Sequence, residues 1–187
     1  MNERLIQNLI WKDLAGRTHG YAGLVVPNCT VFSWESDLIH VSRKHLVTEY
    51  EIKISRSDFR ADLKKIRHRI LSLIKEYERG PSRFYYAVPR DLIEPNEIPE
   101  HAGLIYVYPV FQIVKTAPQL HALPLSEEQR QRLQFNMIAR YWRERMKLDG
   151  EPEKVHKIIH TRRRSAAVAI NGDESGLVAT SADRISS

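Results

Sequence analysis

Two neighbouring segments of the chain are rich in β-branched and aromatic residues and predict a β-hairpin. They are residues 31–41 and 46–54, joined by the short polar run 42–45. Side chains alternate between the two faces of a strand. The second segment therefore has its apolar side chains on one face, Tyr50, Ile52 and Ile54, and its charged side chains on the other, Glu49, Glu51 and Lys53. We expect the apolar face to lie in the core.

The other apolar patterns alternate between helical and extended spacing. Helical spacing occurs in residues 2–14, 59–78 and 126–148. Short apolar runs predict strands at 24–26, closed by Pro27, and at 84–88 and 104–107. The order of these elements predicts a mixed sheet with helices packed against it, which is an α/β fold.

Each predicted helix has an expected cap or an expected buried face. In the first helix this face is Leu5, Leu9, Ile10 and Leu14. In the second helix it is Phe59, Leu63, Ile66, Ile70, Leu73, Ile74 and Tyr77, with Asp58 as the N-cap. A capping box from Ser126 to Gln129 opens the third helix.

The length and composition fit one domain with accessory segments. The chain has 187 residues, of which 42% are hydrophobic. We expect a domain at 1–125, an amphipathic helix at 126–149 and a mobile basic tail at 150–187.

Charge and cysteine content narrow the class of partner and the compartment. The net charge of +6 favours polyanionic partners, although many basic proteins bind no nucleic acid. A single cysteine, Cys29, fits a reducing compartment. No run is long and apolar enough to span a membrane, and the first residues do not resemble a signal peptide. We therefore expect a cytoplasmic protein that contacts no membrane.

Three residues of the hairpin form a candidate catalytic set. Phosphodiester hydrolysis needs a divalent cation and a group that stabilises developing charge. Glu51 and Lys53 share a strand face, and pairing of the two strands would bring Asp37 beside Glu51. The backbone carbonyl of Ile52 would be a further oxygen ligand for a hard cation. Because Glu-x-Lys arises often by chance in a chain that is 28% charged, a solvated strand face is the open alternative.

The surrounding sequence resembles a known nuclease superfamily. The similar segments are Glu51–Lys64, with its Ser-Arg-Ser-Asp-Phe turn, then Arg83–Pro89 and Ile98–Val107. They resemble the PD-(D/E)XK nucleases, and more narrowly the MmcB-type DNA-repair-associated proteins and related phage nucleases. The resemblance covers about residues 31–107. It implies a restriction-endonuclease-like fold and a Mg²⁺-dependent deoxyribonuclease, with Mn²⁺ able to substitute, acting in DNA repair, recombination or phage DNA processing.

The resemblance also implies roles for individual residues. Asp37 and Glu51 would be metal ligands, and Lys53 would be the catalytic lysine. The aspartate stands in the context Trp34-Glu-Ser-Asp37, which departs from the Arg-Ala-Asp context usual in the family. Glu35 is therefore a candidate ligand as well, as is Glu3 on the first helix.

Basic residues after the hairpin are candidate DNA contacts. They are Arg56, Arg60, Lys64, Lys65 and Arg67, and a solvated helix face explains them equally well. A basic aromatic patch around Tyr141 and Trp142, the pair His156 and His160, and the Arg162–Arg164 cluster are weaker candidates, each with a plain structural explanation. A nuclease-fold DNA-binding or accessory protein without turnover is the alternative function.

Overall fold

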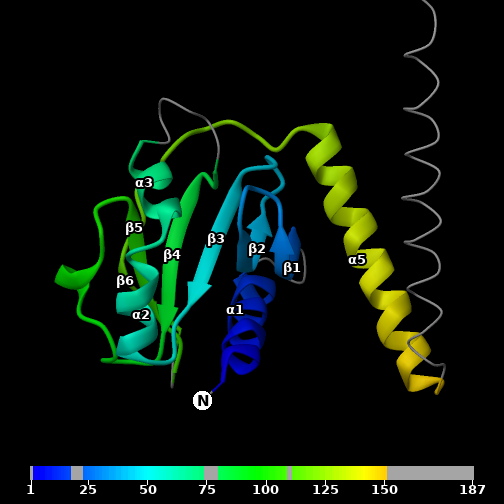
Figure 1. Cartoon of the computed structure of the whole chain (residues 1–187), viewed down its shortest axis with the longest axis horizontal. Coiled ribbons are helices and arrows are strands. Elements are labelled where there is room, and N and C mark those ends of the chain that lie inside the picture. Colours follow the sequence, from blue (N-terminus) through cyan, green and yellow to red (C-terminus); the bar gives the residue numbers. More distant parts are fainter. Residues whose placement is uncertain (1, 18–22, 74–79, 109–110, 151–187) are drawn as a thin grey trace, which may run out of the picture. The chain divides into compact units, whose positions relative to one another are not determined.

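A six-stranded mixed sheet forms the centre of the protein, so the expected α/β fold is confirmed. The computed structural model describes residues 2–17, 23–73, 80–108 and 111–150 (Figure 1). The strands follow the sheet in chain order. They are β1 (Leu24–Thr30), β2 (Glu35–Val41), β3 (Val47–Ile52), β4 (Arg83–Val88), β5 (Ala102–Tyr106) and β6 (Gln112–Lys115). The first three are antiparallel, β3, β4 and β5 are parallel, and β6 returns antiparallel.

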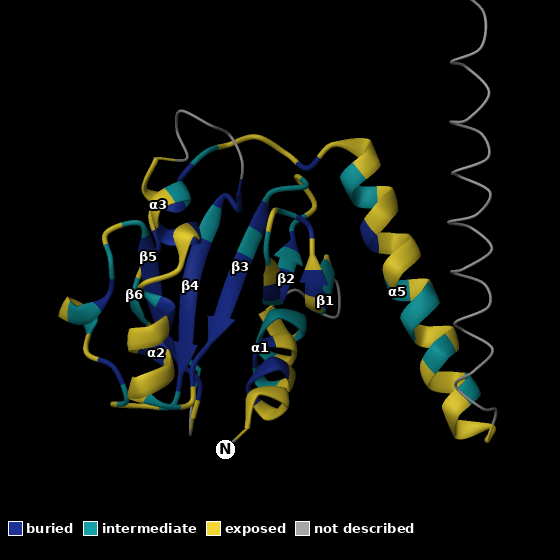
Figure 2. Ribbon diagram, viewed as in Figure 1, coloured by how far each residue is buried: buried dark blue, intermediate teal, exposed yellow. Residues whose placement is uncertain are grey.

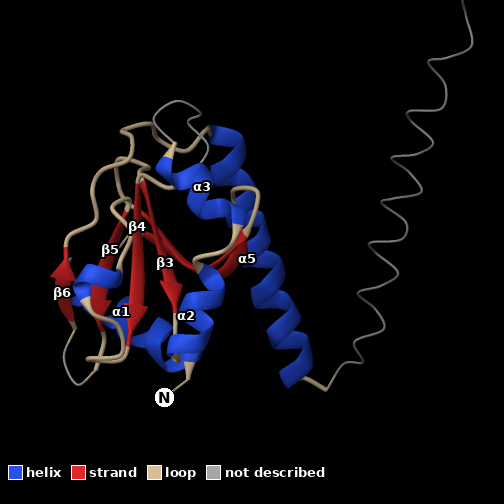
Figure 3. Cartoon of the chain, turned by 60° about the vertical axis from the view of Figure 1, so that its left-hand side comes forward, coloured by secondary structure: helices blue, strands red, loops and turns tan. Residues whose placement is uncertain are grey.

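Helices cover both faces of this sheet (Figure 3). The helices are α1 (Glu3–Arg17), α2 (Arg56–Asp62), α3 (Ile66–Ser72) and α5 (Glu127–Leu148), with a 3-10 turn η1 (Pro95–Glu97). The buried residues Ile6 and Ile10 of α1 pack on the face that includes Tyr50. The opposite face packs against Phe59 of α2 and Leu71 of α3. The crossover through α2 and α3 allows β3 and β4 to run parallel.

Several predicted strand boundaries were wrong, including that of β5, which begins at Ala102 rather than Leu104. β1 continues through Pro27, which pairs with Leu38, because β1 is an edge strand and an edge tolerates a residue without an N–H. β2 begins only at Glu35, and β3 already ends at Ile52. Beyond that end the alternation of side chains stops applying, so Ile54 is 48% exposed rather than part of the core.

The predicted helix 59–78 is interrupted within the described residues. Its N-cap is Ser55 rather than Asp58, because the Ser55 hydroxyl accepts the Asp58 backbone N–H at 3.2 Å. The break between α2 and α3 changes the helical phase, so Ile66 is 70% exposed while Leu71 is buried. The continuation predicted at residues 74–78 lies outside the described residues.

The face of α1 is also rotated from the prediction. Ile6 is fully buried, whereas Leu5 is 44% exposed. Gln7, a polar residue, is buried beside Ile6. The polar partners of Gln7, described below, account for this shift.

The predicted capping box of α5 is confirmed. The Ser126 backbone N–H donates to the Gln129 side chain at 3.0 Å, and the Gln129 N–H donates to the Ser126 hydroxyl at 3.2 Å. Leu133 is buried with residues of β1, β2 and β3. The chain divides into two compact units at 137/138, within α5. In the described part of the second unit the helix exposes large side chains, seen as extensive yellow in Figure 2.

Three predictions concern residues beyond position 150. The mobile tail, the His156–His160 pair and the Arg162–Arg164 cluster lie outside the described residues, apart from Gly150. In the described part of the chain, no helix is both long enough and apolar enough to cross a membrane.

Candidate active site

The β2–β3 hairpin brings the predicted catalytic residues together. Leu38 pairs with Tyr50, so Asp37 lies one position beyond the pairing, opposite Glu51. The Asp37 Oδ2 atom accepts the backbone N–H of Ile52 at 2.7 Å. The aspartate thereby fastens the end of β3 at the point where the two strands cease to pair.

The Asp37 carboxyl lies in an environment that disfavours its charged form. Burial and the nearby Glu51 raise its pKa from 3.8 to about 7, against the opposing effects of the Ile52 N–H and Lys53. Its Oδ2 atom accepts the Ile52 N–H, and Lys53 is the one cation among the named causes that lowers its pKa. The site therefore places a carboxylate beside another carboxylate without a full complement of positive charge.

Glu51, by contrast, is paired with two cations. The Lys53 Nζ atom is 2.7 Å from Oε1, and Arg67 donates to Oε2 at 2.8 Å. All three side chains are buried. Burial lowers the pKa of Lys53, but Glu51, Asp62 and Asp37 outweigh it, so the net pKa is raised and the lysine stays charged.

Arg67 was expected to be a DNA contact, and the structure corrects this. The residue is 3% exposed, and its guanidinium binds both Glu51 and Asp62. A buried guanidinium held by two carboxylates is not placed to follow a DNA backbone. Its neighbour Lys65 has a half-exposed side chain and lies 2.8 Å from Asp62.

A buried cluster around Asp62 was missed by the sequence analysis. Asp62 accepts hydrogen bonds from Arg67 and from the Tyr86 hydroxyl, the latter at 2.9 Å, and its Oδ2 lies 3.0 Å from His68 Nε2. Burial raises the pKa of Asp62, but hydrogen bonds from His68, Arg67 and Lys65 together lower it by more, so the pKa lies below its ordinary value. On one continuous helix, residues five and six positions apart do not share a face. The break between α2 and α3, invisible in the sequence pattern, makes these contacts possible.

The cluster extends to a second histidine. His68 Nδ1 lies 3.1 Å from His101 Nε2. Burial, His68 and Lys115 lower the pKa of His101 to about 4. His101 is therefore neutral near pH 7.

Glu49 is a further buried acid that the sequence analysis placed on the charged face but gave no role. It is fully buried, and Trp34 donates its indole N–H to Oε1 at 2.9 Å. Burial raises the pKa of Glu49 to about 8, although Trp34 and Arg67 oppose the shift. Glu49 is thus largely protonated near pH 7 and fixes the orientation of the Trp34 ring.

The two alternative carboxylates lie in different surroundings. Glu35 is exposed at the start of β2. Glu3 is joined to the hairpin through Gln7, whose amide donates to Glu3 Oε1 at 3.0 Å and to the Asp37 carbonyl at 2.9 Å. Glu3 also contributes to the raised pKa of Asp37. Whether either residue binds a metal stays a prediction.

The donor set fits one hard cation beside Asp37. No group of three or more His, Cys, Asp or Glu side chains suited to a metal occurs in the part of the chain that the structure describes. Mg²⁺ commonly takes one or two carboxylates and keeps several waters, so a large cluster is not required. Asp37 and Glu51, with the Ile52 carbonyl, would supply the protein ligands. Glu51 would have to share its oxygens with Lys53 and Arg67.

The remaining predicted DNA contacts differ in their freedom. Arg56 donates two hydrogen bonds to Glu97, at 2.8 and 2.6 Å, and one to the Leu92 carbonyl, which ties α2 to the loop before β5. Arg60 and Lys64 are exposed. Of the five predicted residues, Arg60 and Lys64 are the better placed to contact a polyanion.

Asp37 gives the metal-free protein a specific pH dependence. Its folded pKa, about 7, lies above its ordinary value of 3.8. Between these values the unfolded chain has released a proton that the folded protein still holds, so the free energy of unfolding falls as pH rises. We expect urea denaturation of wild type in chelator to show this fall from about pH 4, with the Asp37 component ending near pH 7 and that of Glu49, whose pKa is about 8, continuing above it. The variant Asp37→Asn should lack the Asp37 component.

A matched variant separates Asp37 from the other raised acid. Glu49→Gln removes a group whose pKa is about 8 and leaves Asp37 in place. Its stability profile should keep the fall between pH 4 and 7. Identical profiles for wild type and Asp37→Asn would show that Asp37 titrates normally.

Comparisons with known proteins leave the family open. No protein-family model matches the sequence, and no curated protein matches it significantly. Among solved structures the chain is similar to the SPO1766 protein of unknown function from Silicibacter pomeroyi. The two are 24% identical, the match covers 71% of this chain and 82% of that one, and the TM-score is 0.47. A similarity of this degree decides neither family nor activity, so the resemblance to PD-(D/E)XK nucleases stays a prediction.

Proposed function

We propose that this protein is a divalent-metal-dependent deoxyribonuclease with its active site at Asp37, Glu51 and Lys53. The observation that supports it best is the junction of β2 and β3. There the incompletely compensated Asp37 lies opposite Glu51, and Lys53 is held 2.7 Å from Glu51. A hairpin that buries two carboxylates and a lysine at one point bears a cost that a purely structural strand end does not require.

Each residue has a distinct role in the proposal. Asp37 and Glu51 would hold the cation, which would supply Lewis-acid activation of the phosphate and of a water molecule. Lys53, kept charged by its neighbours, stabilises negative charge that develops on the phosphate. Arg67 and Asp62 position the other two side chains. Arg67 binds Glu51, and Asp62 lies 3.5 Å from the Lys53 Nζ atom.

One observation favours the alternative, a nuclease-fold DNA-binding or accessory protein without turnover. Glu51 already accepts from Lys53 and Arg67, so its charge is neutralised without any metal. A metal cation must then compete with the Lys53 ammonium and the Arg67 guanidinium for the carboxylate oxygens of Glu51. An inactive protein would retain this arrangement as a stable ion-pair cluster.

The deciding experiment is a cleavage assay on the full chain. Labelled single-stranded, duplex and branched DNA would be incubated with Mg²⁺, with Mn²⁺ and with chelator. The proposal expects cleavage with either metal and none with chelator. DNA binding without cleavage of any substrate under all conditions would favour the accessory protein.

Binding should depend strongly on salt and little on sequence. Arg60 and Lys64 are exposed cations on the segment that follows Lys53. Each phosphate they neutralise contributes about 0.9 to the log-log salt slope for duplex DNA and about 0.7 for single strands. The double variant Arg60→Ala with Lys64→Ala should therefore weaken binding about equally across sequences and flatten the slope by about 1.8 or 1.4, respectively. Titrations at several salt concentrations measure this.

The control removes the same charge elsewhere. Lys12 and Lys44 are exposed on α1 and in the turn between β2 and β3. Replacing both with alanine should leave the slope within about half a unit of wild type. If the control flattens the slope as much as the test variant, net charge alone governs binding.

A further inference from the structure

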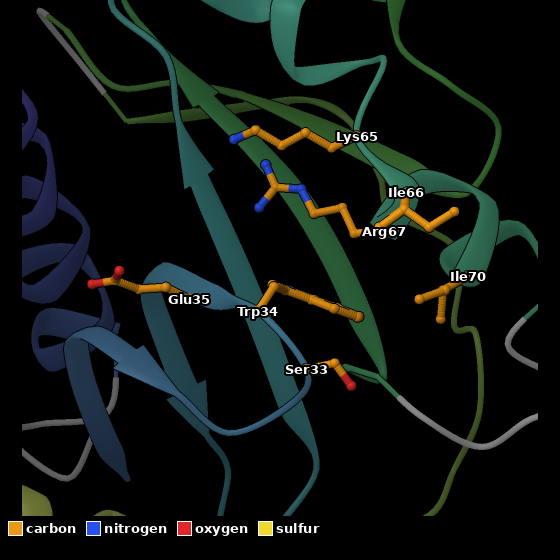
Figure 4. Close-up of a pocket in the computed structure, with 7 residues that line it drawn as sticks. All are labelled: Ser33, Trp34, Glu35, Lys65, Ile66, Arg67 and Ile70. Atoms are coloured by element: carbon orange, nitrogen blue, oxygen red, sulfur yellow. The ribbon is translucent and has the colours of Figure 1, made fainter.

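A pocket opens between α3 and the segment that leads into β2. Its volume is about 410 Å³, within the range of small-ligand sites. The lining residues are Ser33, Trp34, Glu35, Lys65, Ile66, Arg67 and Ile70. Figure 4 shows Lys65, just before α3, and Arg67 of α3 extending side by side, with Trp34 beneath them and Glu35 turned away.

The walls combine an aromatic platform with exposed apolar side chains. Trp34 is held in place because its indole N–H donates to the buried Glu49 at 2.9 Å. Ile66 is 70% exposed, so its aliphatic side chain is available to a ligand in the pocket. A rigid indole facing aliphatic side chains is suited to a flat, apolar group with polar edges.

Two cations connect this pocket to the candidate active site. Arg67 lines the pocket and also binds Glu51, so the pocket and the carboxylate pair share a wall. Its Nε–H is buried and has no acceptor among the described residues, which is rare for a buried donor. Lys65 has a side chain that is 54% exposed, and its ammonium group lies 2.8 Å from Asp62 Oδ1, so a phosphate would share this cation with Asp62.

From these observations we infer that the pocket receives an unpaired base of single-stranded DNA, whose backbone continues to the candidate active site. The base stacks on Trp34 and contacts Ile66 and Ile70, and Lys65 binds the adjoining phosphate. Bases of a duplex are stacked and paired and do not enter such a pocket without being extruded. This inference rests on the proposed nuclease function for its choice of DNA, and it assigns single strands as the substrate class.

The test measures binding in chelator, where no cleavage occurs. The probes are a short fluorescent single strand, the same strand with abasic sites and the matching duplex. Stacking of one base is worth about 1–3 kcal/mol, so wild type should bind the normal strand about fivefold or more tightly than the abasic strand. The duplex should bind more weakly than the normal strand.

Ile66→Ser is the test variant, because the residue is already largely exposed and the fold does not depend on it. We expect Ile66→Ser to reduce the preference for the normal strand to about threefold or less, with unchanged affinity for the abasic strand. Ile113→Ser, an exposed isoleucine on β6, is the matched control and should keep the full preference.

Equal affinity for normal and abasic strands, or an unchanged preference in Ile66→Ser, would overturn the base pocket. Tighter binding of duplex than of single strand would overturn it too. Cleavage assays on the same proteins report separately on the proposed function. Base-dependent binding without any metal-dependent cleavage would reject the proposed nuclease activity and support the base pocket. Metal-dependent cleavage without base-dependent binding would support the nuclease activity and reject the base pocket.

Discussion

Asp37→Asn is expected to lower the rate of metal-dependent cleavage by about a thousandfold or more while the protein stays folded. A loss of this size is seen when a group that stabilises a transition state is removed. The asparagine carbonyl can still accept the Ile52 N–H, so the end of β3 keeps its hydrogen bond. Removing a carboxylate whose pKa is raised to about 7 also relieves its repulsion with Glu51. The melting temperature without metal should therefore not fall, and only cation binding and turnover should be lost.

The matched control is Glu35→Gln, because Glu35 lies two residues away on the same strand and is exposed. Cleavage rates of both variants are compared, together with Mg²⁺ titrations monitored by calorimetry or by activity. These measurements distinguish the contribution of Asp37 to metal binding and turnover from that of Glu35. We expect Glu35→Gln to retain activity within about threefold, as surface substitutions generally have small effects. Full activity in Asp37→Asn would move the metal site away from Asp37, whereas a loss in Glu35→Gln of the same size would make Glu35 a ligand as well.

The sequence was sufficient to predict the hairpin and most other elements, because their patterns are local. Alternation along residues 46–54 predicted the charged face of β3, and the capping box predicted the start of α5. It failed for Ile54, since nothing in the alternation marks where pairing with β4 ends. β6, at Gln112–Lys115, was not predicted because its four residues carry no strong apolar pattern.

The candidate site was predictable only where its residues share a strand or a hairpin. Asp37, Glu51 and Lys53 follow from strand geometry and from the resemblance to known nucleases. The roles of Asp62 and Tyr86 depend on long-range packing, since 24 positions separate them and their contact joins α2 to β4. The break between α2 and α3 turned Arg67 inward, which no helical periodicity across residues 59–78 would indicate.

Arg67→Met is expected to destabilise the protein by about 3–5 kcal/mol, the usual cost of removing one partner from a buried ion pair. Methionine preserves much of the length of the stem but leaves Glu51 and Asp62 without the guanidinium that binds both. Lys53 and Lys65 compensate these carboxylates only in part, because Lys65 is half exposed. Urea denaturation at pH 7 measures the change.

Arg69→Met is the control, since Arg69 lies on the same helix and is exposed. Its free energy of unfolding should stay within about 0.5 kcal/mol of wild type. A double-mutant cycle of Arg67→Met with Asp62→Asn should give a coupling energy of about 1–3 kcal/mol, because the two side chains are in direct contact. If Arg67→Met instead kept its stability and lost affinity for DNA with a flatter salt slope, the guanidinium would be an accessible phosphate contact. The prediction that Arg67 contacts DNA would then be right, and its place in a buried ion-pair cluster would be wrong.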